Sequence, residues 1–338
     1  MNYRIIMIDK FKAVHAIEQD GKLNISISDL SIDDLFPGDV LIQVFYSTVN
    51  YKDGLALKGN KGRIMQKFPM IPGIDFSGIV IESNHKNFVS GDEVIATGWG
   101  LGETHTGGFS QMARVKGDWL IKRPDNISLK SSMILGTAGF TSMLSILELE
   151  DNYIKPKNGP VLVTGGSGGV GSTSILLLSN LGYEVVALTR SAKNLEYLLS
   201  LGASNVIYSD DLDSHNKLLK KGEWAAVIDT VGGDVLGNLI PSIKNNGCIA
   251  VCGNAAGVNF NTNVLPFILR GVRLIGIDSN LCPRERRNIS WNRLNKHIKK
   301  LNLDLITTEV VLSDVFRVAQ EILLGNIRGR IVVDVNNF

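Results

Sequence analysis

The sequence predicts an α/β protein in which a β-rich region precedes a doubly wound parallel sheet. Two observations predict this fold class. In residues 160–280, short apolar runs rich in β-branched residues alternate with helical stretches, and parallel neighbours in a sheet need long, usually helical connections. In residues 1–126, short apolar or alternating runs are instead broken by Gly, Pro and Asp, a pattern typical of strands joined without crossover helices.

Each element follows from its local pattern of apolar and turn-forming residues. The expected order is strands at 40–46, 79–81 and 93–96, helices at 131–135 and 140–149, strands at 161–163, 185–188, 206–208, 226–228, 249–251 and 274–277, helices at 289–301 and 312–324, and a last strand at 331–335. Segment 151–159, which contains Pro, Asn and Lys, is expected to be a linker. The tail after residue 283 could rejoin the first region.

Composition excludes several classes of protein. Of 338 residues, 44% are hydrophobic and 20% are charged, so the chain can bury real cores and is not disordered. The 35 Lys and Arg nearly balance the 33 Asp and Glu, which predicts neither a nucleic-acid nor a membrane partner. Only three cysteines, no recognisable secretory signal and no apolar run of the ~20 residues that span a membrane favour a cytoplasmic location.

The most specific motif is a glycine loop directly after the predicted strand 161–163. Gly166, Gly168 and Gly171 satisfy G-x-G-x-x-G and begin a predicted helix that reaches residue 181. In that setting the first glycine permits a tight turn, the second lets the backbone approach a pyrophosphate, and the third packs the helix on the strand. The N–H groups and dipole at the helix start then hold the phosphates. The motif predicts dinucleotide binding; the alternative is a purely structural turn.

The end of the next predicted strand indicates which dinucleotide binds. An NAD site places Asp or Glu there to bind the ribose 2′-hydroxyl, but this chain has Thr189, Arg190, Ser191 and Lys193. Arg and Lys can form charge-assisted hydrogen bonds with a 2′-phosphate, whereas a carboxylate would repel it. We therefore predict NADPH as the cofactor. The alternative is a basic solvated loop that leaves the choice of cofactor open.

The cysteines argue against a metal site. Zinc needs Cys and His ligands, and a structural zinc needs four of them close together. Cys248, Cys252 and Cys282 are the three cysteines, so the β-rich region has none. We predict no metal ion.

Several blocks of sequence resemble a known family. These blocks are Asn50-Tyr51-Lys52-Asp53, residues 68–78, Thr97-Gly98-Trp99-Gly100, residues 115–120, residues 136–141 and Gly276-Ile277-Asp278-Ser279. Together they resemble the zinc-free quinone-oxidoreductase branch of the medium-chain dehydrogenase/reductase superfamily. More narrowly they resemble its bacterial YhdH/YhfP group, whose best-defined activity is the NADPH-dependent reduction of acryloyl-CoA. Where zinc-dependent relatives have Gly-His-Glu, this chain has Gly73-Ile74-Asp75.

The resemblance has consequences for the fold. It implies a GroES-like catalytic domain in residues 1–128, completed by residues 281–338, and a Rossmann domain that binds NADPH in residues 129–280. Ligands are expected at the junction of the two domains. The resemblance also implies a homodimer joined through the predicted edge strand at 272–277, with an ordinary covered edge as the alternative.

The resemblance further implies a set of cofactor contacts. They are Asn50, Tyr51, Gly166, Ser167, Gly168, Gly169, Val170, Gly171, Thr189, Arg190, Ser191, Lys193, Asn254, Ile268, Ser279 and Asn326. Asn326 rests on the loosest alignment, because its short loop does not match the family uniquely.

The candidate catalytic residues are Tyr51, Lys52 and Asp53. In the family's reaction a hydride adds to the β-carbon of an enoyl thioester and an acid protonates the α-carbon. A neighbouring Lys lowers the pKa of a Tyr, and an Asp can orient the Lys. In the alternative interpretation Tyr51 packs under the nicotinamide, and Lys52 and Asp53 form a structural ion pair. For Asp75 we favour a structural hydrogen-bonding role.

The candidate substrate residues come from a loop and from the tail. Trp99 could stack on an acyl chain and His105 could titrate near neutrality, although a His in such a loop is more often a structural hydrogen bonder. Arg284 and Arg287 lie in a basic cluster that could bind the phosphates of CoA. A surface patch at a helix start explains that cluster equally well.

These features support one leading function and two alternatives. The leading hypothesis is an NADPH-dependent reductase of acryloyl-CoA, a small-molecule thioester. An NADPH:quinone oxidoreductase would need a flatter apolar pocket and no phosphate-binding arginines. A non-catalytic NADPH-binding protein would not need the polar residues at 50–53.

Overall fold

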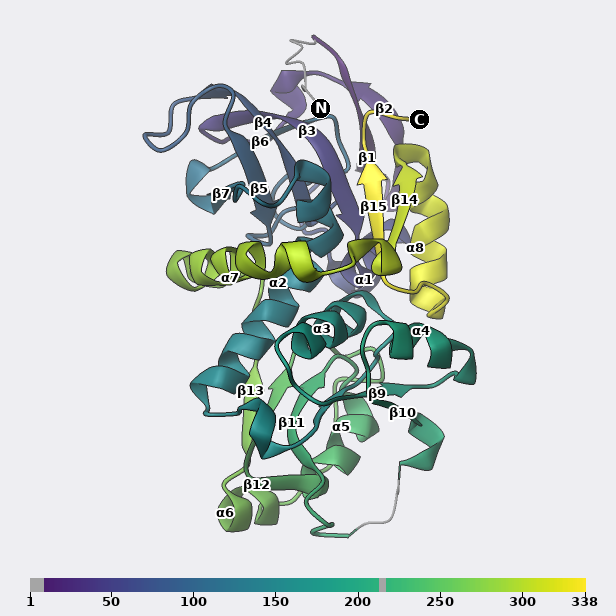
Figure 1. Ribbon diagram of the computed structural model, residues 1–338. Coiled ribbons are helices and arrows are strands. Elements are labelled where there is room, and N and C mark those ends of the chain that lie inside the picture. The colour runs from purple at the N-terminus through teal and green to yellow at the C-terminus, as the bar shows by residue number, and fades with distance from the viewer. Residues whose placement is uncertain (1–8, 213–216) are drawn as a thin grey trace. The chain divides into compact units, whose positions relative to one another are not determined.

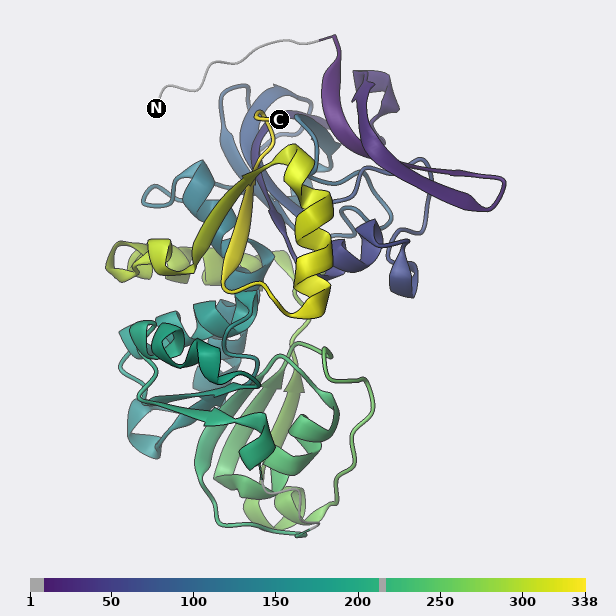
Figure 2. The ribbon, with the colours of Figure 1, turned by 90° about the vertical axis from the view of Figure 1, so that its right-hand side faces the viewer.

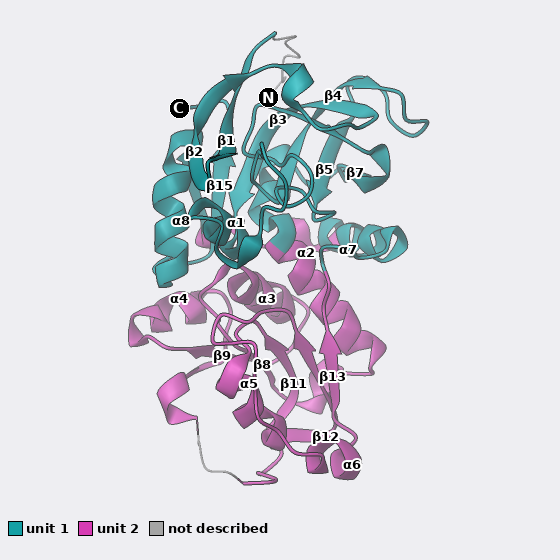
Figure 3. Ribbon diagram, turned by 180° about the vertical axis from the view of Figure 1, so that it is seen from behind, with its two compact units in different colours: residues 1–137, 279–295, 307–338 teal, residues 138–278, 296–306 magenta. Residues whose placement is uncertain are grey.

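The computed structural model describes residues 9–212 and 217–338. The chain forms two compact units (Figure 3). Unit 1 comprises residues up to 137 together with 279–295 and 307–338, and unit 2 comprises 138–278 and 296–306. The domain boundaries expected from the sequence, at 128/129 and 280/281, stay a prediction.

Unit 1 is built on antiparallel strands. Its strands are β1 (Phe11–Gln19), β2 (Lys22–Leu30), β3 (Val40–Val49), β4 (Asp75–Ser83), β5 (Glu93–Thr97), β6 (Met112–Val115), β7 (Leu120–Lys122), β14 (Thr307–Val311) and β15 (Arg330–Asp334). β1 and β2 form a hairpin, and the larger sheet has the order β14-β15-β3-β4-β5-β7 with β6 also paired to β3. The runs predicted at 40–46, 79–81 and 93–96 all lie within strands.

The tail contributes residues 279–295 and 307–338 to unit 1 (Figure 2). β15 pairs antiparallel with β3, so that Ile331 lies opposite Val49, and β14, which the sequence pattern did not predict, pairs parallel with β15. Helix α8 (Val315–Leu324) packs on α1 (Tyr51–Leu57) so closely that a Cβ at Gly54 would lie 2.7 Å from a methyl of Ile322. The tail therefore supplies one face of the packing around α1.

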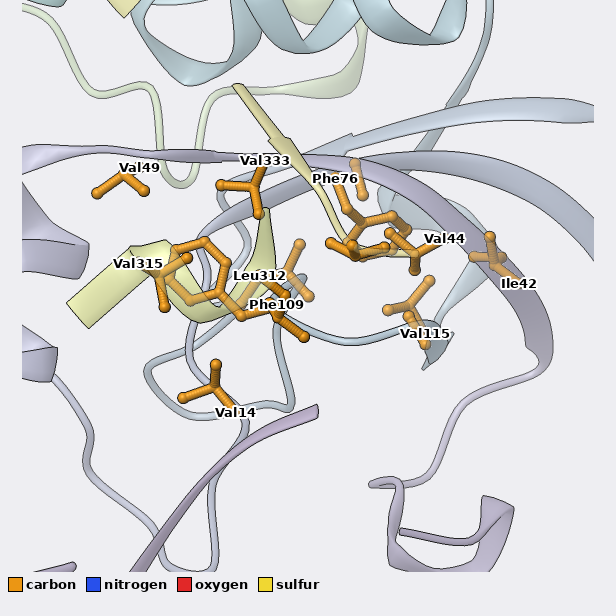
Figure 4. Packing of buried hydrophobic residues seen from close by; sticks show 14 of the residues in the cluster. Val14, Ile42, Val44, Val49, Phe76, Phe109, Val115, Leu312, Val315 and Val333 are labelled. Carbon is orange, nitrogen blue, oxygen red and sulfur yellow. The ribbon is translucent and has the colours of Figure 1, made fainter. Parts of the chain in front are cut away.

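The core of unit 1 joins strands that are distant in the sequence (Figure 4). Ile42 and Val44 from β3 and Phe76 from β4 are fully buried together with Val333 from β15 and Val315 from α8. Burial of each such side chain stabilises the fold by about 1.5–3 kcal/mol. The core thus holds the tail against β3.

Unit 2 contains the parallel sheet (Figure 1). Its strands are β8 (Val161–Val163), β9 (Val185–Thr189), β10 (Asn205–Tyr208), β11 (Trp224–Asp229), β12 (Ile243–Val251) and β13 (Arg273–Gly276), in the order β10-β9-β8-β11-β12-β13. All the pairings are parallel. The strand order reverses between β8 and β11, and ligands bind at the carboxyl ends of the strands at such a point. The predicted fold class is confirmed.

The helices differ from prediction in detail. Unit 2 has α3 (Gly169–Asn180), α4 (Leu195–Ser200), α5 (Gly233–Leu239) and α6 (Leu265–Arg270), and α7 (Arg284–His297) begins five residues before its predicted start. The two helices expected at 131–135 and 140–149 are one element, α2 (Leu129–Asp151), kinked at Gly136.

Among the described residues α2 alone has the length and hydropathy of a membrane span. Of its most apolar stretch, 89% is buried inside the protein, as in the core helix of a soluble protein.

Candidate functional site

The glycine loop of unit 2 leads from β8 into α3. Gly168 caps the helix, and its own N–H donates to the carbonyl of Gly165 at 3.0 Å. A Cβ at Gly168 would meet only that carbonyl, at 3.4 Å, whereas a Cβ at Gly171 would lie 2.2 Å from it. The first N–H groups of α3 have no partner within the helix. The loop therefore offers donors and an open approach, as a pyrophosphate requires.

The tight turn itself is made one residue earlier than expected. We assigned the turn to Gly166, but Gly165 has the positive φ, +58°, and a Cβ there would lie 2.3 Å from the hydroxyl oxygen of Thr230. At Gly166 a Cβ would meet the side chains of Leu198 and Ile175 at 3.1–3.2 Å. Gly165 thus permits the turn, and Gly166 lets α3 and α4 pack beneath it.

Asp229, which the sequence analysis missed, accepts hydrogen bonds from residues on both sides of the strand switch point and so stabilises this loop. It ends β11 and is fully buried. The hydroxyl of Thr164 donates to Asp229 Oδ1 at 2.7 Å, and the N–H of Gly232 donates to Oδ2 at 2.8 Å. Burial raises the pKa of Asp229, and these hydrogen bonds oppose the shift. Its signal in the sequence is a carboxylate at the end of an otherwise apolar strand.

The residues predicted for the 2′-phosphate follow β9. Thr189 ends the strand with its side chain buried, and Asn194 donates to its hydroxyl at 3.1 Å. Arg190 and Lys193 are exposed and Ser191 is half-buried. Exposed cations beside a strand end match the charge of a phosphate; the assignment to the 2′-phosphate stays a prediction.

The other predicted cofactor contacts are scattered. Asn254 is exposed in the loop after β12, at the carboxyl ends of the strands. Ile268 lies on α6, whose Arg270 binds the carbonyl of Ile243 at the opposite end of β12. The structure does not bring Ile268 to the glycine loop. Ser279 follows β13, and Asn326 is exposed after α8, with its amide donating to Glu321 at 2.7 Å.

In unit 1 the predicted catalytic residues lie on a helix that the all-β prediction for this region did not include. Asn50 caps α1, and Tyr51, Lys52 and Asp53 form its first turn. The backbone N–H of Asn50 donates to Asp53 Oδ2 at 2.8 Å, which explains why the helix starts here. Tyr51 is 42% exposed, the most exposed residue of this turn.

Behind this turn lies a buried group of polar side chains, which we call the Asp75 cluster. Its members are Thr48, Asn50, Asp53, Asp75, Thr137 and Arg330. Asp75 accepts from the Thr48 hydroxyl at 2.8 Å, from the Asn50 amide at 3.1 Å and from the Thr137 N–H at 2.8 Å. The hydrogen-bonding role favoured for Asp75 agrees with these contacts.

The kink in α2 belongs to the same arrangement. Gly136 has φ +50° and ψ −152°, and Thr137, the next residue, presents its N–H to Asp75. A Cβ at Gly136 would lie 2.7 Å from the guanidinium of Arg330 and 2.9 Å from a carboxylate oxygen of Asp75. Only glycine allows the helix to approach the cluster at this point.

Asp53 is the most perturbed acid of the cluster. It is 1% exposed and accepts from the N–H of Ile74 at 3.0 Å. Burial, followed by the charge of Asp75, raises the pKa of Asp53 from 3.8 to about 7, against the hydrogen bonds from Asn50 and Ile74. A carboxyl group with such a pKa can hold or release a proton near neutral pH.

Lys52 does not pair with Asp53, so the alternative of a structural Lys52–Asp53 ion pair is wrong. The ammonium of Lys52 lies 2.9 Å from Glu103 Oε1 in the glycine-rich loop 97–108. Glu103 is also held through its backbone carbonyl, which accepts from Gln66 at 2.8 Å. The sequence analysis did not predict this contact, because Lys52 and Glu103 are 51 residues apart in the chain.

Arg287 is 1% exposed and is part of the interior. It donates to the Thr97 carbonyl at 2.7 Å and to the Ser279 carbonyl at 3.2 Å, and its guanidinium lies 4.9 Å from the ring centre of Trp99. The expectation that Arg287 binds a CoA phosphate is therefore corrected. The guanidinium is buried, donates to backbone carbonyls and lies against the ring of Trp99. Trp99 has a φ of +59°, and its backbone N–H donates to the backbone carbonyl of Asn280 at 2.9 Å.

His105 and Arg284 have different surroundings. The ring nitrogens of His105 lie 3.2 Å from the carbonyl oxygen of Thr106 and 3.0 Å from that of Pro37, and the side chain is buried. This environment favours the structural interpretation of His105 over substrate contact. Arg284 pairs with Asp118 at 3.1 Å on the surface, where an anion can still reach it.

The remaining nucleophile and metal candidates do not fit a reactive site. Burial raises the pKa of Cys248 to about 11 and that of Cys252 to about 12, so both thiols stay protonated at neutral pH. Across residues 9–212 and 217–338, no group of three or more His, Cys, Asp or Glu could hold a metal ion. Ile74 is apolar, and Asp75 already accepts three hydrogen bonds, so this stretch does not suit zinc.

Comparison with protein families agrees with the two-part architecture. Residues 36–125 match the alcohol dehydrogenase GroES-like domain, and residues 169–295 match the zinc-binding dehydrogenase family. The second family is named for zinc binding, but the described residues of this chain contain no group of His, Cys, Asp or Glu that could hold a metal ion.

Two curated relatives match almost the whole chain. One is the "Probable acrylyl-CoA reductase AcuI" of Escherichia coli strain K12, 46% identical over 94% of this chain and 98% of the relative. The other is acrylyl-CoA reductase AcuI of Ruegeria pomeroyi, 42% identical over 94% and 97%.

Solved structures of similar proteins also match almost the whole chain. The YhdH oxidoreductase of Salmonella enterica, in complex with NADP, superposes with a TM-score of 0.93 at 45% identity and covers 96% of this chain and 99% of its own. Bacillus subtilis YhfP, with NAD bound, gives a TM-score of 0.92 at 42% identity over 96% and 99%.

Proposed function

This chain belongs to the YhdH/YhfP group of the medium-chain dehydrogenase/reductase superfamily, and we propose that it reduces the carbon–carbon double bond of acryloyl-CoA with NADPH, giving propanoyl-CoA. The observation that carries the proposal is 42–46% identity over 94% of the chain to acrylyl-CoA reductases. The intact Asn50–Asp53 turn and the open glycine loop support a catalytic protein over a purely structural one.

The cofactor has a plausible place in unit 2. The open approach at Gly168 fits a pyrophosphate, and Arg190 and Lys193 supply the charge that a 2′-phosphate needs. NADPH, when bound, supplies the hydride that adds to the β-carbon of the substrate. The protein's tasks are to orient the two reactants, to stabilise negative charge on the thioester oxygen and to deliver a proton to the α-carbon.

We assign proton delivery to the first turn of α1. Tyr51 is an exposed residue at the start of this helix, and the next residue, Lys52, is held by Glu103. In this proposal the Tyr51 hydroxyl gives its proton to the α-carbon, and the ion pair with Glu103 holds Lys52 next to it in the sequence. Asp53 faces the interior, so its role is to hold Asn50 and Ile74 in place, and it does not touch substrate in this proposal.

Substrate contacts are proposed for two residues. The ring of Trp99 lies against the guanidinium of Arg287, and its backbone is bonded to Asn280; an aromatic ring suits the short acyl group or the pantetheine arm. Arg284 is the surface arginine that remains available for a CoA phosphate once Arg287 is excluded by its burial.

One assay tests the function. NADPH oxidation is followed at 340 nm with acryloyl-CoA, with a quinone and with neither. We expect turnover that depends on acryloyl-CoA and that is weaker with NADH. Absence of turnover with acryloyl-CoA would overturn the proposal; turnover with the quinone alone would support a quinone oxidoreductase, and NADPH binding with no turnover a non-catalytic protein.

We also propose that the protein acts in the cytoplasm as a homodimer. β13 stands at one end of the strand order in unit 2, and an exposed sheet edge can pair with a second copy. The exposed apolar side chains of Val264, Ile268 and Leu269 next to it in the sequence would gain burial in such a contact.

A further inference from the structure

We propose that Arg330 is a positioning residue for the reaction proposed above: its guanidinium fixes the orientation of the Asn50 side chain and thereby the first turn of α1, which carries Tyr51. The proposal rests on the proposed function for its kinetic consequences. It joins residues 280 positions apart.

All three guanidinium nitrogens of Arg330 have a separate acceptor. Nε donates to the carbonyl of Ile134 at 3.0 Å, one terminal nitrogen to Asn50 Oδ1 at 3.2 Å, and the other to the hydroxyl oxygen of Thr48 at 2.9 Å. The residue is 2% exposed. Arg330 therefore links the kinked helix α2, the end of β3 and the cap of α1 through one planar group.

The contact with Asn50 determines which way its amide points. Asn50 Nδ2 faces acceptors only: Thr48 Oγ1 at 3.0 Å, Asp75 Oδ2 at 3.1 Å and Asp53 Oδ2 at 3.2 Å. Its oxygen faces the donor on Arg330. If this donor is removed, the amide oxygen loses its partner inside the protein, and only the acceptors around Nδ2 hold the amide.

The charges of the cluster give a second reason for Arg330. Asp53 and Asp75 are both buried, and their charges favour the cationic form of Arg330 although burial lowers its pKa. A buried charge needs a paired partner, and removal of one partner leaves the other uncompensated. Without Arg330 the described residues of this cluster include no cation beside Asp75 and Asp53, the acceptors of the Asn50 amide, so we expect the cap at Asn50 to loosen.

Lysine cannot fully replace Arg330. Its ammonium keeps the charge, but it is one atom and cannot reach three acceptors that lie around a planar fork. We therefore expect a graded series. Arg330→Met lowers kcat with acryloyl-CoA about 100-fold, the cost of a catalytic group displaced by roughly 1 Å, and Arg330→Lys lowers it about tenfold. The KM for acryloyl-CoA and the Kd for NADP+ stay within about threefold, since the cofactor's phosphates are assigned to unit 2.

The matched control is Arg123→Met. Arg123 is a half-buried arginine of unit 1 that pairs with Glu93 and donates to the Ile127 carbonyl at 2.7 Å, away from the cluster. It should keep kcat within about twofold of wild type. Equal losses of kcat in Arg123→Met and Arg330→Met would show a general destabilisation and overturn the proposal, as would wild-type kcat in Arg330→Lys.

A double-mutant cycle separates positioning through Asn50 from a merely structural role. If Arg330 acts through Asn50, then Arg330→Lys costs little further kcat in an Asn50→Ala background; additive losses would contradict the proposal. This test needs only the charge-preserving lysine variant if Arg330→Met does not fold.

A measurement that does not depend on activity distinguishes failure of the proposed function from failure of the proposed role of Arg330. If the wild type does not turn over acryloyl-CoA, the proposed function fails, and hydrogen–deuterium exchange across residues 50–57 decides the positioning. We expect Arg330→Lys to speed exchange in this segment at least about tenfold, because α1 opens more easily once its cap is loosened, while Arg123→Met leaves it unchanged. Unchanged exchange in Arg330→Lys would overturn the role of Arg330.

Discussion

The functional elements of the two units differ in composition: the element in unit 2 is backbone, and the element in unit 1 consists mainly of side chains. In unit 2 the glycine loop is a continuous stretch of backbone, residues 165–171, whose geometry depends on missing side chains. In unit 1 the Asp75 cluster consists of side chains and one backbone N–H from β3, α1, β4, α2 and β15, joined by hydrogen bonds and charge. The first should respond mainly to added volume, and the second should respond to charge and protonation. Three experiments test this difference between the units.

The largest expected effect is on the pH dependence of unit 1. In the folded protein Asp53 holds its proton up to a pKa of about 7, whereas an unfolded Asp releases it near 3.8. Its stabilising contribution is therefore complete below pH 3.8 and is lost as the pH rises through 7. Between pH 5 and pH 8 the free energy of unfolding should fall on the order of 3 kcal/mol from this group.

Urea unfolding followed by tryptophan fluorescence measures this, since Trp99, Trp119 and Trp291 all lie in unit 1. Asp53→Asn cannot titrate, so its stability should change much less over the same pH range. A wild-type pH profile in Asp53→Asn would remove Asp53 as the titrating group and weaken the contrast between the units.

The next effect separates two glycines of the same loop. Gly171→Ala places a Cβ 2.2 Å from a backbone carbonyl and should lower the free energy of unfolding by about 2 kcal/mol through overpacking. Gly168→Ala meets that carbonyl only at van der Waals distance, 3.4 Å, so it should keep the melting temperature. It should nevertheless raise the Kd for NADPH at least about tenfold, because the methyl group occupies the approach of the pyrophosphate.

Thermal unfolding together with calorimetric titration of NADPH distinguishes these two variants. If both lose stability equally, or if Gly168→Ala binds NADPH normally, the assignment of packing to Gly171 and of phosphate approach to Gly168 is contradicted.

The smallest effect concerns cofactor choice. Arg190→Ala should weaken NADPH by about 1.5 kcal/mol, the strength of a hydrogen bond to a charged group, or roughly tenfold. NADH is the control, because it lacks the 2′-phosphate and should lose little affinity. Equal losses for the two cofactors would show that Arg190 does not contact the 2′-phosphate.

The contrast between the units also explains what the sequence could predict. The six strands of unit 2 and its glycine loop were predicted, because each is a local pattern of apolar runs and glycine spacing. The Asp75 cluster was not, although Asn50, Asp53 and Asp75 were each singled out. Nothing local relates Asn50 to Arg330, and the partner of Lys52 proved to be Glu103 and not its neighbour Asp53. Buried polar contacts of this kind are set by tertiary pairing, here by β15 beside β3.

That pairing has a consequence for the order in which the protein can form during synthesis. β3 is made early, but its partner β15 and the guanidinium of Arg330 leave the ribosome almost 300 residues later. The sheet of unit 2 lies wholly between these two segments and can assemble first. Until residue 330 emerges, β3 lacks its partner β15 and the Asp75 cluster lacks Arg330. The part of the protein that is translated first is thus the part that is finished last.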